Sequence, residues 1–292
     1  MQNTCHSDYG RLQSVYIKKF EDAALHEKNI GEQWQKLNFL SKPDFENGKK
    51  EYNQFENLLK KSGASIFYFG QDPHVTLDSL YCRDASIATD GGMILCSMGK
   101  EARVPEPGAQ RKIFEKNGVE LLGEIVLPGT VEGGDVAWLD PHTLVVGHTY
   151  RTNTEGIKQL GLLLKKIGVE IIVTSLPHYK GPSDVFHLMS IFSPVDKDLA
   201  VVYSPLMPIS FRQELQRRGY RFVEVPDAEF ESMGCNVLAI APRVCIMVEG
   251  NPQTRDALLK QGCEVNEYSG NEISVKGGGG PTCLTRPILR TI

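Results

Sequence analysis

A fivefold repeat of one local pattern constrains the fold of this chain more than any other feature. Five times, an amphipathic segment ends in basic residues and a glycine and is followed by an extended apolar run, as in "LLKKSGASIFYF" and "LLKKIGVEIIVTSL". Basic side chains complement the negative end of a helix dipole, and glycine supplies the left-handed cap that ends a helix. The five capping glycines are spaced 43 to 55 residues apart and are Gly63, Gly118, Gly168, Gly219 and Gly262.

Each repeat is predicted to contain two further strands. Apolar residues at helical spacing, such as Leu160 and Leu164, precede each glycine, and a pair of extended runs around a turn, such as "ASIATDGGMILCSM", separates successive helices. The fifth unit lacks its second run, which "LQSVYIKKF" near the N-terminus could supply. An open doubly wound sheet would also contain capped helices, but it lacks hairpins between them. We therefore predict one α/β domain over residues 1–292, built as five blades of ββαβ type around an axis.

Composition narrows the classes of partner. A net charge of -4 and a pI near 6.0 provide no basic surface for nucleic acid or for an anionic membrane. The N-terminus lacks the apolar core of a signal peptide, and no apolar run is long enough for a membrane helix, so we expect a cytoplasmic protein. The seven cysteines include no CxxC pair, so neither a disulfide framework nor a zinc site is expected. A small-molecule partner is the remaining expectation, with no cofactor and no metal.

Polar residues recur with the period of the repeat. One stands at or just before the first strand of each predicted hairpin, and hairpins that surround an axis would bring these starts together. The five residues are Asp84, Asp135, His187, Asn236 and Cys283, and Glu132 lies three residues before the second of them. Taken singly, each has a structural reading: a core thiol, a hydrogen-bonded core histidine, half of an ion pair, or a turn. Their common phase favours one shared pocket.

A glycine run precedes the last of these residues in "KGGGGPTC". Such a run is also typical of a phosphate-binding loop, but that motif requires Lys-Ser or Lys-Thr after its last glycine, and Pro281 follows here.

The motifs "GGGGPTC", "EGGD", "YCRD", "FHL" and "GHTYRTN" together resemble the guanidine-modifying enzymes: arginine deiminases, dimethylarginine dimethylaminohydrolases and amidinotransferases. The resemblance covers nearly the whole chain and implies the five-bladed α/β propeller known as the pentein fold. It implies that Cys283 is the nucleophile, His187 the general acid and base, and Glu132 the active-site acid. It also implies that Asp84 grips the substrate's guanidinium group.

The same resemblance implies a substrate-binding role for Asp78 and α-carboxylate binding by Arg103 and Arg151, and we also count Asp135 among the substrate-binding residues. A guanidinium is a planar cation, so a buried site must meet it with carboxylates. A thiolate is nucleophilic enough to attack its central carbon. We expect a lowered thiol pKa at the nucleophile, so that it reacts well below about pH 8.

The substrate is predicted from one departure from the family pattern. Deiminases and amidinotransferases place a carboxylate two residues after the histidine, and here that residue is Met189. An apolar thioether favours N-methyl groups, which points to a dimethylarginine dimethylaminohydrolase that releases citrulline and dimethylamine. Arg83 argues the other way, because that branch often has an acidic residue there. Deimination or dihydrolysis of arginine, amidino transfer and a non-catalytic binding module remain open as alternative functions. A homodimer is among the oligomeric states that the sequence leaves open.

Overall fold

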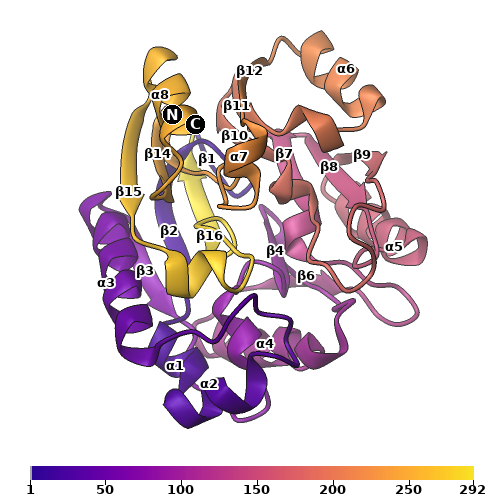
Figure 1. Ribbon diagram of the computed structural model, residues 1–292. Helices are drawn as coiled ribbons and strands as arrows, with labels where there is room; N and C mark the ends of the chain where they lie inside the picture. The colour runs from indigo at the N-terminus through magenta and orange to yellow at the C-terminus, as the bar shows by residue number, and fades with distance from the viewer. Residues whose placement is uncertain (1) are drawn as a thin grey trace.

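The computed structural model describes residues 2–292, which form five small β-sheets set around a common centre (Figure 1). In the four three-stranded sheets, an antiparallel hairpin is followed by a helix and by a third strand that runs parallel to the second. This is the predicted ββαβ unit. Five separate sheets rule out the open doubly wound alternative and confirm the α/β propeller.

Five helices link the second and third strands of the blades, and each ends at a predicted glycine. The five glycines have φ between +68° and +83°, and a Cβ at any of them would meet no other atom within 4 Å. Glycine is therefore favoured at these positions by the left-handed backbone conformation, and not because a side chain would clash with its neighbours. The blade helices are α3 (Phe45–Lys61), α4 (Glu106–Lys116), α5 (Thr154–Lys165), α6 (Ile209–Arg217) and α8 (Pro252–Lys260). The repeat did not predict three shorter helices, α1 (Phe20–Ala24), α2 (Glu27–Gln33) and α7 (Asp227–Phe230).

In each three-stranded sheet, two strands form a hairpin and the third strand runs parallel to the second. The hairpins pair β4 (Ser86–Thr89) with β5 (Gly92–Leu95), β7 (Val136–Asp140) with β8 (Thr143–His148), β10 (Phe192–Asp196) with β11 (Leu199–Val202), and β13 (Leu238–Ala241) with β14 (Val244–Val248). The parallel third strands are β6 (Leu121–Glu124), β9 (Glu170–Ser175), β12 (Arg221–Glu224) and β15 (Glu264–Tyr268). The last sheet contains β1 (Asn3–Thr4), β16 (Thr285–Thr291), β2 (Arg11–Ile17) and β3 (Ser65–Tyr68).

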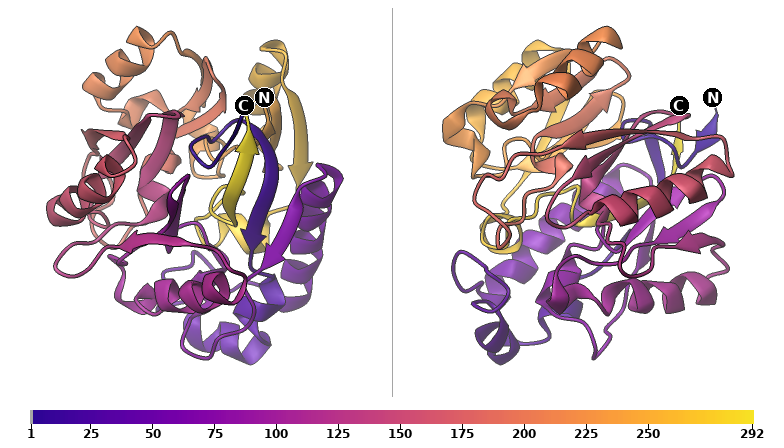
Figure 2. Two further views of the ribbon diagram at one scale, coloured as in Figure 1. Left: turned by 180° about the vertical axis from the view of Figure 1, so that it is seen from behind. Right: turned by 90° about the vertical axis from the view of Figure 1, so that its right-hand side faces the viewer.

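The two ends of the chain complete one blade together. β16 pairs antiparallel with β2, so the hairpin that the fifth unit lacks in sequence is formed across the termini, as predicted. β1 adds to the other edge of β16. Figure 2 shows both chain ends close together beside this sheet. The ring is therefore closed by main-chain hydrogen bonds between the first and last strands.

The apolar core lies between each sheet and its helix. Leu160 and Leu164 of α5 are fully buried against Leu144 and Val146 of β8 in one hydrophobic cluster. Helix α5 begins at an Asn153 cap, whose side chain accepts a hydrogen bond from the Gly156 N–H. Among the described residues, no helix has the length and apolar character needed to cross a membrane.

The five in-phase polar residues occupy equivalent places in the blades. Each stands one to five residues before the first strand of its hairpin, which is β4, β7, β10, β13 or β16. First hairpin strands contact those of other blades, as β16 does with β4 and β10 does with β7. The loops that enter these strands therefore meet at one end of the axis.

Candidate active site

A cavity of about 170 Å³ opens where these loops meet. Cys283 and His187 line it together with Arg103, Arg151 and Asp78. Cys283 is only 8% exposed and His187 only 4%. The predicted nucleophile and the predicted acid–base residue thus face one buried space, although they come from different blades.

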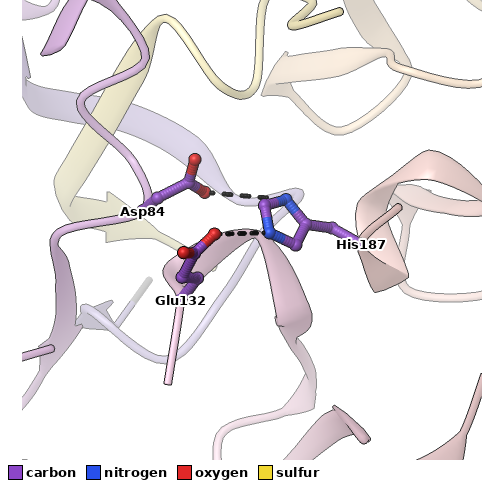
Figure 3. A group of neighbouring side chains, drawn as sticks. All are labelled: Asp84, Glu132 and His187. Carbon is purple, nitrogen blue, oxygen red and sulfur yellow. Dashed lines mark hydrogen bonds and ion pairs between the residues drawn. The ribbon is translucent and has the colours of Figure 1, made fainter. Parts of the chain in front are cut away.

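His187 lies between two carboxylates (Figure 3). Its Nε2 is 2.8 Å from Glu132 Oε2, and its Nδ1 is 4.0 Å from Asp84 Oδ1. Burial disfavours the imidazolium, but the charges of Asp135, Asp84 and Glu132 outweigh it and raise the pKa of His187 to about 9. The imidazole is therefore protonated at neutral pH.

Glu132 is fully buried and serves as the anchor of the cluster. Its Oε1 accepts hydrogen bonds from the backbone N–H groups of Gly99 at 3.0 Å and Lys100 at 3.2 Å. Burial alone would raise the pKa of Glu132, but His187 and Arg151 hold it well below the usual range. The carboxylate stays ionised and fixes one nitrogen of His187.

Asp84 is held from one side by Arg103. The Arg103 Nη1 lies 2.5 Å from Asp84 Oδ2, and its remaining hydrogen bonds go to both Glu106 oxygens and to the Tyr81 carbonyl. The other carboxylate oxygen, Asp84 Oδ1, is buried and accepts no hydrogen bond from any of residues 2–292. Neither Asp84 nor Glu132 lines the cavity itself; each contacts a side chain that does.

Cys283 is held by two neighbours. Asn236 Nδ2 lies 3.4 Å and Thr282 Oγ1 lies 3.8 Å from its sulfur. Burial and the charge of Asp84 raise the pKa of the Cys283 thiol, although these two hydrogen bonds and Arg83 act in the opposite direction. This corrects the expectation of a lowered pKa in the free protein: the sulfur lies too deep, and too near a carboxylate, for a resting thiolate to be favoured.

Glycines let the loops of the site approach one another. A Cβ on Gly133 would overlap the Arg83 carbonyl oxygen, and one on Gly134 would overlap the His187 ring and lie 2.8 Å from Asp84 Oδ1. The "EGGD" motif is therefore more than a turn, because only glycine lets the Glu132 loop pass between Asp84 and His187.

The other predicted substrate-binding residues differ in whether they line the cavity. Asp78 lines the cavity and pairs with Lys100 at 2.7 Å. Arg151 also lines it and lies 3.4 Å from Glu132. Asp135 does not line it: one oxygen accepts from the Thr149 hydroxyl and the other from the Leu188 N–H. Burial raises the pKa of Asp135 to about 6.

Arg103 and Asp135 both make hydrogen bonds to other groups of the protein. Arg103, which was expected to bind a substrate carboxylate, lines the cavity and donates hydrogen bonds to Asp84, Glu106 and Tyr81. Asp135 was expected to bind substrate, but it holds the residue that follows His187. Both depend on contacts between distant loops, which a spacing pattern does not contain.

Asn236 follows the same spacing along the sequence as the other polar residues of the repeat, but the sequence assigned it no role. Its contact with the Cys283 sulfur and its place before β13 both follow the period of the fold, so the repeat contained the signal. Lys100 and Tyr81 also line the cavity. Tyr81 is the first residue of the "YCRD" motif, but the sequence assigned no role to either residue.

Three side chains of the site also form a candidate group of metal ligands. Asp84, Glu132 and His187 could each offer one ligand atom, and these atoms lie within 4.8 Å of one another. Two guanidinium groups already lie beside the carboxylates, Arg103 at Asp84 and Arg151 at Glu132. Cations at these distances oppose a divalent ion electrostatically. The same repulsion is about half as large for a singly charged organic cation, which the arrangement therefore admits more readily.

Known proteins match most of this chain in sequence or in fold. A family model described as "N,N dimethylarginine dimethylhydrolase, eukaryotic" matches residues 28–290. The N(G),N(G)-dimethylarginine dimethylaminohydrolase of Pseudomonas aeruginosa is 26% identical over 246 residues, which is 84% of this chain and 90% of that protein.

Two solved structures share the fold. A dimethylarginine dimethylaminohydrolase mutant from Pseudomonas aeruginosa, complexed with citrulline, aligns at 22% identity with a TM-score of 0.77, over 95% of this chain and all of that one. SxtG, an amidinotransferase from Microseira wollei, aligns at 16% identity with a TM-score of 0.79, over 98% of this chain and 97% of that one. The five-bladed architecture is thus common to proteins described as hydrolases and as transferases.

Proposed function

Because the chain belongs to the N,N-dimethylarginine dimethylhydrolase family, we propose that it is a cysteine-dependent hydrolase of guanidino groups. The proposed substrate is an N-methylated arginine, which would yield citrulline and dimethylamine. One observation carries the proposal: Cys283 and His187 line one cavity, and His187 is held between the carboxylates of Glu132 and Asp84.

The carboxylates supply a site for a planar cation. Asp84 Oδ1 is buried and has no donor in the described part of the chain, and a buried carboxylate oxygen favours a charge-assisted hydrogen bond. A guanidinium N–H bound there would lie close to His187 Nδ1, which is 4.0 Å from the same oxygen. The reacting carbon would then lie between an acid–base nitrogen and the thiol of the cavity.

Cys283 would act as the nucleophile. After the thiol has lost its proton to solvent, the thiolate forms a bond to the central guanidino carbon, and the tetrahedral adduct then breaks its bond to the methylated nitrogen. The departing amine takes a proton from His187, which leaves a thiouronium group on the sulfur. His187 next removes one proton from water, whose oxygen attacks the same carbon. The C–S bond then breaks, the remaining hydroxyl proton is lost to solvent as the citrulline carbonyl forms, and the thiolate is regenerated.

Glu132 would fix which nitrogen of His187 takes part. Because Nε2 is bonded to Glu132 Oε2, Nδ1 is the nitrogen left for proton transfer. Asp135 would assist by holding the Leu188 N–H, and we assign it a positioning role in place of substrate binding.

The substrate would also help to ionise the thiol. Its guanidinium would offset the charge of Asp84, which is one cause of the raised pKa of Cys283. Thiolate absorbance, taken as the difference between wild type and Cys283→Ser, should therefore rise when an inert guanidinium ligand binds. No change on binding would rule this step out.

Arg151 would bind the α-carboxylate of the substrate. It lines the cavity and makes only long contacts, 3.4 and 3.5 Å, to Glu132. Arg103 would instead orient Asp84 through the ion pair between them. Met189 is buried and lines the same cavity, which supports the preference for N-methyl groups.

The test is incubation of the pure protein with arginine, mono- and dimethylarginine, citrulline and agmatine, and identification of the released amine by mass spectrometry. We expect dimethylamine from dimethylarginine, and Cys283→Ser should abolish product formation. Cys5→Ser, which alters a thiol away from the cavity, should be fully active. Arg151→Gln should lower the kcat/KM for substrates with an α-carboxylate more than that for agmatine.

Each other outcome has a defined meaning. Ammonia from arginine would identify a deiminase or dihydrolase, and product that requires an added amine would identify an amidinotransferase. Full turnover by Cys283→Ser would overturn the thiol mechanism. Absence of turnover on every substrate, with and without an amine acceptor, would favour a non-catalytic binding module.

A further inference from the structure

We propose that Asn236 is a further catalytic residue, which donates a hydrogen bond to the Cys283 sulfur and holds it in line for attack. The inference rests on the proposed thiol chemistry and adds a residue to it. Asn236 Nδ2 lies 3.4 Å from Cys283 Sγ, and both side chains line the cavity.

The orientation of the Asn236 amide follows from its other contacts. Its Oδ1 lies 3.0 Å from the Thr282 backbone nitrogen and 2.8 Å from Thr282 Oγ1. A backbone N–H can only donate, so the atom facing it must be the amide oxygen. The amide nitrogen is then the atom that faces the sulfur, and it has hydrogen atoms to donate.

Packing leaves Asn236 little freedom to turn away. It is 6% exposed, and its own N–H donates to the Met233 carbonyl at 3.0 Å. Gly280, in the glycine run, lies against it: a Cβ there would come within 2.6 Å of the amide carbon and oxygen. The run thus brings the nucleophile's loop directly onto the Asn236 amide.

The chemistry needs a donor at this point. Burial and Asp84 both disfavour a negative sulfur, so a neutral N–H aimed at it stabilises the thiolate without adding charge. The same bond favours the sulfur as leaving group when the intermediate breaks down. The hydrogen bond from Asn236 therefore assists both the attack of the thiolate and its later departure from the intermediate.

The main alternative is that Asn236 only braces Thr282. Asn236→Asp separates the two roles, because an aspartate keeps the acceptor for the Thr282 N–H and hydroxyl but offers the sulfur no donor when ionised. Asn53→Asp is the matched control, since Asn53 is exposed on α3.

The measurement is the rate of Cys283 alkylation by iodoacetamide as a function of pH, followed at that residue by mass spectrometry. We expect Asn236→Asp to raise the apparent pKa of the thiol by at least about one unit, and to lower kcat/KM about 10- to 100-fold, mainly through kcat. Asn53→Asp should behave as wild type. Asn236→Ala, which loses the donor and adds neither a charge nor a hydroxyl, should shift the profile in the same direction and serves if the aspartate variant does not fold.

A folded Asn236 variant whose alkylation profile superimposes on that of the wild type would overturn the proposal. Alkylation needs no turnover, so this result is distinct from failure of the proposed function, which would appear as a wild-type protein that acts on none of the substrates.

Discussion

The buried His187 imidazole lies among three carboxylates, and their charges set its protonation state. The pKa of His187 is raised to about 9 from an ordinary value of 6.5, in spite of its burial. Folding therefore takes up a proton at this residue. The stability that this provides is fully present below pH 6.5 and is lost as the pH rises through about 9.

The His187→Gln substitution tests this dependence of stability on pH. The difference in unfolding free energy between wild type and variant should shrink between pH 6.5 and 9 by roughly 3 kcal/mol at most, because each pKa unit is worth about 1.4 kcal/mol. Urea unfolding at several pH values measures it, and using the difference cancels groups that titrate alike in both proteins. A difference that grows with pH would contradict the charge assignment.

At the level of elements, the glycine run before Cys283 is set by the side chains that it passes. A Cβ on Gly277 would overlap the Tyr81 hydroxyl, one on Gly279 would overlap the Tyr81 ring, and one on Gly280 would crowd Asn236. Gly278 instead adopts φ of +73°. Each of the four glycines thus has a physical cause, either close approach or conformation.

Gly279→Ala should destabilise the protein by about 1–3 kcal/mol, since the buried Tyr81 ring must move to admit a methyl group. Activity should fall as well, because the displaced loop carries Cys283. Gly108→Ala is the control: Gly108 lies in α4, and a Cβ there meets nothing within 4 Å, so alanine should be neutral or stabilising by up to about 1 kcal/mol. Urea unfolding compares the two, and equal stability would show that the loop has room.

At the scale of the whole molecule, the segment between β1 and β2 ties three blades together. Asp8 accepts from Arg83 Nη2 at 2.7 Å and from the Trp138 N–H at 2.7 Å. Arg83 lies before β4, and Trp138 lies in β7. Arg290 of β16 is also buried, and the charge of Asp8 favours its protonated form. The first residues of the chain therefore supply a counter-ion for buried arginines from two blades.

Asp8→Asn should cost about 3–5 kcal/mol of unfolding free energy, because it leaves buried guanidinium groups without their carboxylate. Asp256→Asn, which removes one partner of an exposed pair with Arg255, should change it by less than about 1 kcal/mol. Chemical denaturation tests both variants. An Asp8→Asn protein as stable as wild type would show that the arginines are neutralised in another way.

The sequence by itself determined the repeat and the phase of the site. Helix periodicity, basic last turns and glycine caps are local signals, so the five helices and their returning strands could be predicted, and with them the closure of β16 onto β2. The same period placed Asp84, His187 and Cys283 at equivalent blade positions. The short helices α1, α2 and α7 had no such period and were missed.

Only the tertiary structure decided which charges meet. Four features of the site depend on distances between blades. They are the hydrogen bonds of Arg103, the bond from the Leu188 N–H to Asp135, the raised pKa of Cys283 and the hydrogen bond that Asn236 donates to its sulfur. Those distances are set by close backbone passages, such as Gly134 against His187. Electrostatic effects depend steeply on separation and burial, and a spacing of about 50 residues along the chain contains neither.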